Sequence, residues 1–356
     1  MKQIHKFFAV ALVSAAMFSS CSKDDDDNTP DVPNGIYDHG YFVLNEGQFG
    51  NPRTSGVTFI GEDGSQDNDI FENVNPTASE LGDALQSMFF DDDHAYIISG
   101  ASNQITVVDR YSFEYIATID SDLASPRYGA IAEGKAYVTN SNGWDDGSDD
   151  FVTVIDLTDY STSTFNMKNA ERVIEDDDMI YFANGYFGAG NRVTVLDPNT
   201  ESTTEIDLGE GNSPNSLEEE DGSLYVLTNN AVSTSSSIFK INLSTNTIAL
   251  KIDLPAELQN AKQLHIEDDI MYFTNATSVF KLNTNADENS FAQVLEYEST
   301  SEYGAMYGFA VEDDKIYIAD AGDFASAGTT YEYSLSGSLI NTYTVGVGPN
   351  GFYFND

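Results

Sequence analysis

The residues best suited to recognise a small molecule are arginines, aromatic rings and side-chain amides. The chain has five arginines and one tryptophan. Arginine offers a planar fork of donors, and an aromatic ring offers a rigid apolar face. This combination predicts non-covalent ligand binding, although the rings could instead cover loop bases and the arginines balance acidic neighbours. The candidate ligand-binding residues are Arg127, Tyr128, Trp144, Arg172, Tyr186, Phe187, Asn215, Gln263, Tyr307 and Asn350.

Residues for catalysis or for a resident metal are sparse. The four histidines are scattered along the chain, and the single cysteine excludes an intrachain disulfide, a cysteine-based zinc site and a CxxC redox pair. No GxSxG motif, phosphate-binding P-loop or strand-linked GxGxxG motif occurs. We therefore expect no catalytic residues and no cofactor.

One acidic segment has the oxygen atoms that calcium prefers. It runs over residues 142–150, and its candidate ligands are Asn142, Asp145 and Asp149. The spacing departs from an EF-hand loop, which requires a late glutamate and a glycine at a fixed position. An acidic surface loop without a metal is the simpler interpretation.

Charge and composition exclude two further classes. The chain carries 15 Lys and Arg against 59 Asp and Glu, a formal charge of −44, which would repel a phosphate backbone. Nucleic-acid binding is therefore excluded. Aromatic residues make up 12% and hydrophobic residues 40%, which excludes a globally disordered chain.

The first 35 residues predict export and anchoring. A basic start is followed by an apolar run at residues 7–18, too short to span a bilayer but suited to a signal peptide. Small residues then precede Cys21, which predicts a lipoprotein signal over 1–20 with lipidation of Cys21; an ordinary secretory signal is the alternative. Asp24–Asp27 resembles the acidic export signal of Bacteroidota surface lipoproteins. Residues 21–35 would form a tether and 36–356 the folded domain.

The folded region is a repeat. Strands led by tyrosine begin at Tyr41, Tyr96, Tyr137, Tyr181, Tyr225, Tyr272 and Tyr317, mostly 41 to 47 residues apart. Each is followed by a further strand with alternating apolar residues and then by a polar turn. Four short antiparallel strands in about 45 residues are typical of a propeller blade. We predict an all-β, seven-bladed β-propeller.

The two ends of the chain predict how the ring closes. No inner strand precedes Tyr41, and an extra copy of that strand stands at Gly348–Phe354. Pairing it with the Tyr41 strand would complete the first blade from both termini and remove an open edge.

The strand order then separates two faces. The turns between the first and second strands of the blades are acidic, as at Glu175–Asp178 and Glu267–Asp269, and are read as solvated tight turns. The opposite face receives four of the five arginines; Arg110 is the exception. Near the central channel, the inner strands add Gln86, Arg127, Arg172, Asn215, Gln263, Tyr307 and Asn350. This second face is the predicted ligand face.

Several blocks resemble a known family. The repeat YVTN at Tyr137–Asn140 is similar to the YVTN-type seven-bladed propellers, and further blocks resemble the BtuG-type surface lipoproteins of Bacteroidota. These are Phe42–Gly50, Leu81–Met88, Ser125–Asn140 and Gly348–Phe354. The resemblance implies a non-enzymatic lipoprotein, anchored in the outer membrane and exposed on the cell surface. It would capture cobalamin or another corrinoid and pass it to a TonB-dependent outer-membrane transporter.

Two other functions remain open from the residues. The first is a propeller enzyme or redox partner, either lyase-like or quinone-dependent. An enzyme should bring histidines, metal ligands or a nucleophile and its base together. His94 falls in an acidic turn and His265 inside an inner strand, so neither is expected to meet another histidine. The second is a structural or adhesive surface protein without a small ligand.

Overall fold

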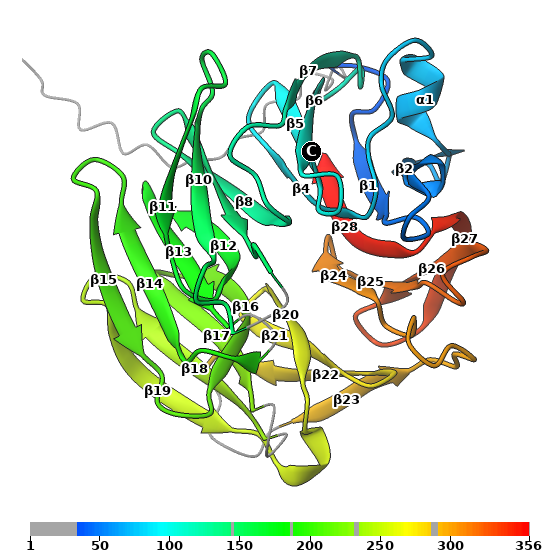
Figure 1. Ribbon diagram of the computed structural model, residues 1–356. Helices are drawn as coiled ribbons and strands as arrows, with labels where there is room; N and C mark the ends of the chain where they lie inside the picture. The colour runs from blue at the N-terminus through cyan, green and yellow to red at the C-terminus, as the bar shows by residue number, and fades with distance from the viewer. Residues whose placement is uncertain (1–33, 144–145, 186–187, 231–234, 286–290, 356) are drawn as a thin grey trace, which may run out of the picture. The chain divides into compact units, whose positions relative to one another are not determined.

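The computed structural model describes residues 34–143, 146–185, 188–230, 235–285 and 291–355. Residues 34–356 form one compact unit. Seven four-stranded antiparallel sheets surround a central channel in this unit (Figure 1). The prediction of an all-β, seven-bladed propeller is confirmed. None of the helices in the described ranges has the length and apolar character to cross a membrane.

The blades follow one another along the chain, each built from the inside outwards. Blade 1 has the order β28 (Pro349–Asn355), β1 (Gly40–Asn45), β2 (Gly56–Gly61), β3 (Gln66–Asp67). Blade 2 contains β4 (Leu85–Phe90), β5 (His94–Ser99), β6 (Gln104–Asp109), β7 (Tyr115–Ile119). Blade 3 contains β8 (Pro126–Ala132), β9 (Lys135–Asn140), β10 (Phe151–Asp156), β11 (Thr162–Asn166). Blade 4 contains β12 (Ala170–Asp176), β13 (Met179–Asn184), β14 (Arg192–Asp197), β15 (Ser202–Asp207).

The remaining blades repeat the plan. Blade 5 contains β16 (Ser213–Glu220), β17 (Ser223–Asn229), β18 (Ser236–Asn242), β19 (Thr247–Asp253). Blade 6 contains β20 (Lys262–Glu267), β21 (Ile270–Asn275), β22 (Ser278–Asn283), β23 (Ala292–Glu296). Blade 7 contains β24 (Gly308–Glu312), β25 (Lys315–Asp320), β26 (Ala327–Ser334), β27 (Leu339–Val347). The helical segments are α1 (Ile70–Val74), η1 (Pro52–Thr54), η3 (Ala256–Leu258).

The core lies between blades, because both faces of a blade are covered by its neighbours. In β5, Tyr96 and Ile98 pack against blade 3, whereas Ala95 and Ile97 pack against blade 1. This follows from the two-residue period of a strand. Each junction between neighbouring blades holds one hydrophobic cluster of described residues. The repeating tyrosines are buried in these clusters at the second strand of every blade.

Both termini complete blade 1, as predicted. Figure 1 shows β28 at the C-terminus lying beside β1 near the start of the domain. The two strands pair antiparallel, with Val43 opposite Phe352 and Tyr41 opposite Phe354. Phe352 and Phe354 pack on one side in the cluster between blades 7 and 1, while Tyr353 lines the channel.

The far end of β28 is held by a buried amide. Asn355 is fully buried and donates from Nδ2 to the Tyr37 carbonyl at 2.5 Å. Its Oδ1 accepts from the Arg110 guanidinium, which also lies over the Phe90 ring at 4.9 Å. Arg110 therefore braces the closure instead of contributing to a ligand site.

The acidic turns have a backbone reason for their composition. Asp268 and Asp269 both have left-handed φ angles, 49° and 63°, and Asp313 and Asp314 have 49° and 58°. Two consecutive left-handed residues are the geometry of the two-residue hairpin turn that matches the strand twist, and Asp, Asn and Gly tolerate it best. The carboxylates of this face are thus accounted for by the turns.

Candidate functional site

The candidate site is built by irregularities in the inner strands. A register shift occurs where each of six inner strands begins, in β4, β8, β12, β16, β20 and where β28 meets β1. A bulge removes a residue from the ladder and re-aims its side chain. The residues at these shifts include Gln86, Arg127, Tyr128, Glu171, Arg172, Asn215, Gln263 and Asn350. In blade 7, Tyr307 directly precedes β24 and takes the corresponding place.

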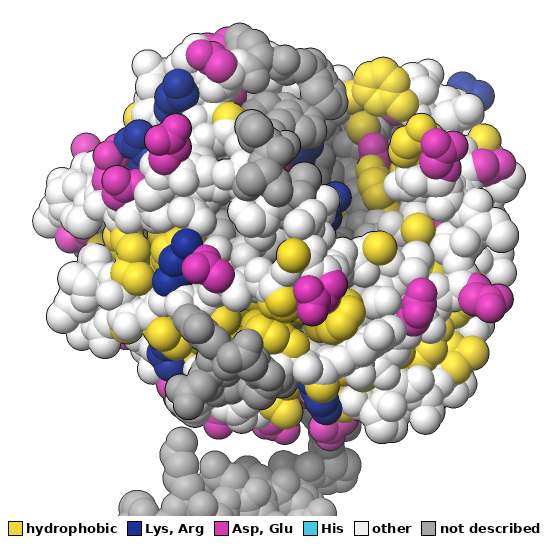
Figure 2. Space-filling model, turned by 90° about the horizontal axis from the view of Figure 1, so that it is seen from below, with side chains coloured by type: hydrophobic (Ala, Val, Ile, Leu, Met, Phe, Trp, Pro, Cys, Tyr) yellow, Lys and Arg dark blue, Asp and Glu magenta, His cyan; other side chains and the backbone are white. Residues whose placement is uncertain are grey.

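Most of these side chains line one cavity. It has a volume of about 600 Å³, within the range of small-molecule sites. Six of the seven residues predicted near the channel, together with Tyr128, lie in its wall; Asn215 is not among the lining residues. Figure 2 shows a hollow on one face of the molecule, with basic side chains in its wall and carboxylates spread over the surrounding surface.

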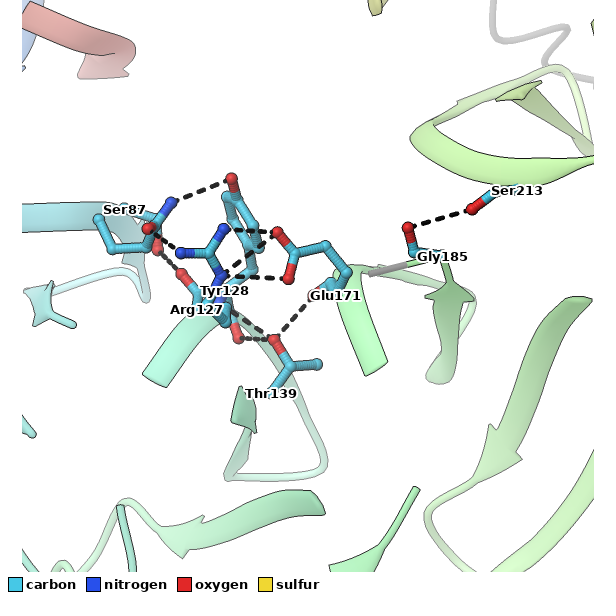
Figure 3. Close-up of polar contacts among 8 residues, drawn as sticks. Ser87, Arg127, Tyr128, Thr139, Glu171, Gly185 and Ser213 are labelled. Atoms are coloured by element: carbon cyan, nitrogen blue, oxygen red, sulfur yellow. Dashed lines mark hydrogen bonds and ion pairs between the residues drawn. The ribbon is translucent and has the colours of Figure 1, made fainter. Parts of the chain in front are cut away.

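Arg127 is committed to its neighbours. Its Nη2 lies 2.7 Å from Glu171 Oε1 and its Nε lies 3.1 Å from Glu171 Oε2. A third donor, Nη1, bonds the Gln86 side-chain oxygen. Ser87 Oγ donates to the Arg127 carbonyl at 2.6 Å, and Thr139 Oγ1 donates to the Glu171 carbonyl at 2.7 Å. This network ties blades 2, 3 and 4 together (Figure 3).

Arg172 is placed differently. Its guanidinium lies over the Tyr128 ring, 4.1 Å from the centroid, which is a cation–π contact. Within the described ranges it makes no hydrogen bond and no ion pair. The Tyr128 hydroxyl accepts a hydrogen bond from Gln86 Nε2 at 3.1 Å, which helps to hold the ring.

A carboxyl group and an imidazole face each other further along the channel. Glu218 Oε1 lies 3.6 Å from His265 Nδ1. Burial raises the pKa of Glu218 to about 8, although Arg172 opposes the shift. Burial, reinforced by Arg172, lowers the pKa of His265 to about 4. Both groups are therefore neutral near pH 7.

Sequence reasoning missed this pair. His265 lies beside Glu218, a residue that the sequence analysis did not single out. An alignment of the inner strands could have predicted that Glu218 lies in the cavity. Glu218 stands three residues after the bulged Asn215, as Tyr353 stands three after Asn350, and both line the cavity.

The opposite wall is held by another carboxyl group. The Tyr307 hydroxyl donates to Glu46 Oε2. Burial raises the pKa of Glu46, and burial together with this carboxylate raises the pKa of Tyr307. Gln263 Nε2 donates to the Tyr307 carbonyl at 3.2 Å, linking blade 6 to blade 7.

Two asparagines each have a side-chain oxygen without a hydrogen-bond partner among the described residues. Asn215 Nδ2 donates to the Ala261 carbonyl at 3.1 Å, and Asn350 Nδ2 donates to the Leu85 carbonyl at 2.7 Å. Their Oδ1 atoms are buried and have no hydrogen-bond partner among the described residues. A buried polar atom without a partner costs free energy, so each oxygen calls for a donor from water or a ligand.

The remaining candidates do not join the cavity wall. Cys21, Trp144, Asp145, Tyr186 and Phe187 lie outside the described residues. Arg53 and Arg192 form ion pairs with Glu80 and Glu205 and are absent from the cavity lining. The ligand face expected to carry four arginines therefore brings only Arg127 and Arg172 into the cavity.

Two groups of acidic residues in the described ranges bear on metal binding. Asn142 Nδ2 donates to Asp149 Oδ2 at 2.8 Å, so these two calcium candidates bond each other. Elsewhere in the described ranges, oxygens of Glu220, Asp221 and Asp269 lie within 4.8 Å of one another. These belong to exposed or half-buried turn positions, where acidic residues suit the backbone.

Solved structures with the same fold are numerous and distant. A quinonprotein alcohol dehydrogenase-like protein from Bacteroides thetaiotaomicron has a TM-score of 0.65 and 16% identity over 91% of this chain and 80% of that chain. A functionally unknown protein from Desulfotomaculum acetoxidans has a TM-score of 0.62 and 12% identity over 89% and 100%. Virginiamycin B lyase from Staphylococcus aureus, solved with quinupristin, has a TM-score of 0.56 and 14% identity over 78% and 96%. Such identities establish the fold alone.

Sequence comparison gives a family. No curated protein matches the chain significantly. The family model described as Domain of unknown function (DUF5074) matches residues 39–353, which span the propeller from β1 to β28. The chain therefore belongs to the DUF5074 family.

Proposed function

We propose that the protein is a non-catalytic binding protein that captures a polar small molecule in the central cavity. One observation carries this proposal: the beginnings of six inner strands present glutamine, arginine, tyrosine and asparagine side chains to one cavity of about 600 Å³. Asn350, which lines this cavity, has a buried Oδ1 with no partner among the described residues. Acceptors without donors in a concave polar site are the features of a ligand pocket.

The ligand class that best suits these groups is a corrinoid such as cobalamin, in line with the resemblance to BtuG-type lipoproteins. A corrinoid carries amide side arms, whose N–H groups could bond the Asn350 oxygen, and its nucleotide arm carries a phosphate. The cavity would take an arm of the corrinoid, and Trp144, Tyr186 and Phe187, which lie outside the described residues, remain the sequence's candidates for stacking on the macrocycle.

The test is calorimetry with cyanocobalamin on the chain starting at residue 22. A matched variant, Asn350→Trp, places a bulky ring in the cavity wall, and thermal melting confirms that it folds. Binding to the wild type and its loss in this variant would support the proposal. Undiminished binding in the variant would put the site elsewhere, and no heat at high micromolar cyanocobalamin would reject the corrinoid. Recovery of the ligand unchanged by chromatography distinguishes binding from catalysis.

We also propose that Cys21 is lipidated, that the protein is displayed at the outer-membrane surface, and that it delivers its ligand to a TonB-dependent transporter. The support is the leader, the lone thiol at its end and the acidic run behind it. Cys21→Ala should release the protein from the membrane fraction. Neutralising Asp24–Asp27 should keep the lipid but protect the protein from protease added to whole cells. Unchanged fractionation and accessibility would contradict both steps, and co-purification from solubilised membranes tests the transporter.

A further inference from the structure

We infer that Arg172, and not Arg127, is the anion-binding residue of the cavity, and that it receives a carboxylate or phosphate group of the ligand. The inference rests on the proposed ligand capture in the same cavity, which it makes more specific. The two arginines stand at the bulges of adjacent blades and line the same space, but their surroundings differ.

Arg127 has little left to offer an anion. Its donors reach both oxygens of Glu171 and the side-chain oxygen of Gln86. A ligand carboxylate would have to displace a bidentate partner that is already in place and largely buried. Arg127 thus organises the wall and offers no free charge.

Arg172 has its recognition groups free. Its five N–H donors bond no described residue, while the Tyr128 ring supports the flat face of the guanidinium. Guanidinium donors lie in the plane of the group, so stacking fixes that plane and leaves the fork to bond two oxygens of one anion. Carboxylate and phosphate share this two-oxygen geometry.

The charges around Arg172 leave it uncompensated. The titratable groups that act on it come from three other inner strands, namely Glu218 on β16, His265 on β20 and Tyr353 on β28. Burial raises the pKa of Glu218 to about 8, lowers that of His265 to about 4 and raises that of Tyr353. All three are neutral near pH 7. The arginine next to them therefore carries the unpaired charge of this part of the cavity.

Glu218 then becomes an internal competitor at higher pH. As the pH rises through about 8, Glu218 loses its proton and places a carboxylate in the field of Arg172. Anion affinity should fall over this range, beyond any change in the probe itself. In Glu218→Gln the fall should disappear, because the amide cannot ionise.

The first experiment measures thermal stabilisation by sodium phosphate and sodium acetate against sodium chloride at constant ionic strength. A ligand that binds the folded state raises the melting temperature with its concentration. We expect at least one oxyanion to stabilise the wild type, and Arg172→Gln to weaken that effect by about tenfold or more, as for loss of a charge-assisted hydrogen bond. The comparison of phosphate with acetate tells which group the site prefers.

Two variants keep the test interpretable. Arg172→Lys keeps the charge but removes the guanidinium fork, so it should retain part of the oxyanion stabilisation. It replaces Arg172→Gln as the test if the glutamine variant folds poorly. Glu171→Gln leaves Arg172 in place and should keep oxyanion stabilisation. The inference is overturned if neither oxyanion stabilises the wild type beyond chloride, or if Arg172→Gln and Arg172→Lys both respond like the wild type.

A second pair of probes separates this inference from the corrinoid proposal. Cyanocobalamin carries the phosphate and dicyanocobinamide lacks it. Equal binding of both to the wild type, unchanged in Arg172→Gln, would preserve ligand capture and overturn the anion site. Arg172-dependent stabilisation by phosphate or acetate without any corrinoid binding would preserve the anion site and reject the corrinoid.

Discussion

The two ends of the inner strands follow opposite rules. At their acidic turns, successive blades repeat the same solution, with pairs such as Asp177–Asp178, Asp268–Asp269 and Asp313–Asp314 in left-handed conformations. At their bulged ends the blades differ, presenting glutamine, arginine, asparagine or tyrosine to the cavity. The turn ends of blades 3 to 7 are alike because their hairpins share one backbone geometry, whereas the corresponding turn of blade 2 has no left-handed residue. The bulged ends are free to differ because their side chains leave the ladder.

This contrast separates structural residues from candidate functional ones. A ring of carboxylates is conspicuous in the sequence, yet the hairpin geometry explains it without a ligand. The bulged residues have no such common explanation. The bulges themselves contain both structural and candidate functional residues. The Arg127 guanidinium bonds Glu171 within the cavity wall, whereas the Arg172 guanidinium lies on the Tyr128 ring.

Removing the inner strand β28 should have the largest effect on stability. The deletion takes away both the bulge at Asn350 and the end of the strand that is held by Asn355. Deletion of residues 348–356 removes β28 with the buried aromatic rings of Phe352 and Phe354. Burial of a large apolar side chain contributes about 1.5–3 kcal/mol, so we expect a loss of several kcal/mol and association through the exposed edge of β1. Thermal melting and light scattering check this. Wild-type melting would show that the termini do not close the ring.

Substituting Arg127 and Arg172 in turn should change the free energy of unfolding by different amounts. Arg127→Met leaves the Glu171 carboxylate without its partner, and loss of a charge-assisted bond costs about 1–3 kcal/mol. Arg172→Met breaks no hydrogen bond to a described residue and should change the free energy of unfolding less. Urea denaturation compares them. Equal destabilisation by both variants would contradict the inference that Arg127 stabilises the cavity wall and Arg172 does not.

The stability of the propeller should depend on pH through the channel pair. Glu218 has a folded pKa of about 8 against an ordinary 4.5, so the folded state keeps a proton that the unfolded chain has lost, and stability falls as the pH rises between these values. His265, at about 4 against 6.5, gives the opposite slope over its own range. The two slopes oppose each other up to about pH 6.5, and only the Glu218 slope remains from there to about pH 8.

Glu218→Gln isolates this effect. The variant should lose the fall in stability between about pH 6.5 and 8, and below pH 6.5 it should show the rise due to His265 alone. Denaturant midpoints measured from pH 4 to pH 9 provide the check. A wild-type pH profile in the variant would mean that Glu218 is ionised in the folded protein.

The smallest effect is expected at the acidic turns. Replacing Asp268 and Asp269 by Asn and Gly keeps residues that accept left-handed angles, so stability should change by about 0.5 kcal/mol or less and ligand binding should be unaffected. Valine at either position should cost about 1–2 kcal/mol, because a β-branched residue resists that conformation. A loss of ligand binding in the Asn-Gly variant would move the functional end of the channel to the acidic face.

The repeat was readable in the sequence because its causes are local. The buried tyrosine at the second strand, the alternation of apolar residues and the left-handed turns all recur within one blade, and each has its own residue signature. The orphan strand at residues 348–354 was equally visible, since a closed ring needs an inner strand that blade 1 lacks at its own start. The inner-strand residues near the channel followed from this repeat.

What each channel residue does was decided only by the folded ring. Arg127 and Arg172 have the same side chain in the bulges of adjacent blades, Arg127 as the first bulged residue and Arg172 as the second. Arg127 meets Glu171, 44 residues later, while Arg172 lies on Tyr128, 44 residues earlier. Glu218 and His265 come from the neighbouring inner strands β16 and β20 of two adjacent blades, and they meet only because the folded ring places these strands side by side. Local patterns determine the blade because its strands are neighbours in the chain, whereas the charge balance of the cavity depends on side chains that only the closed ring brings together.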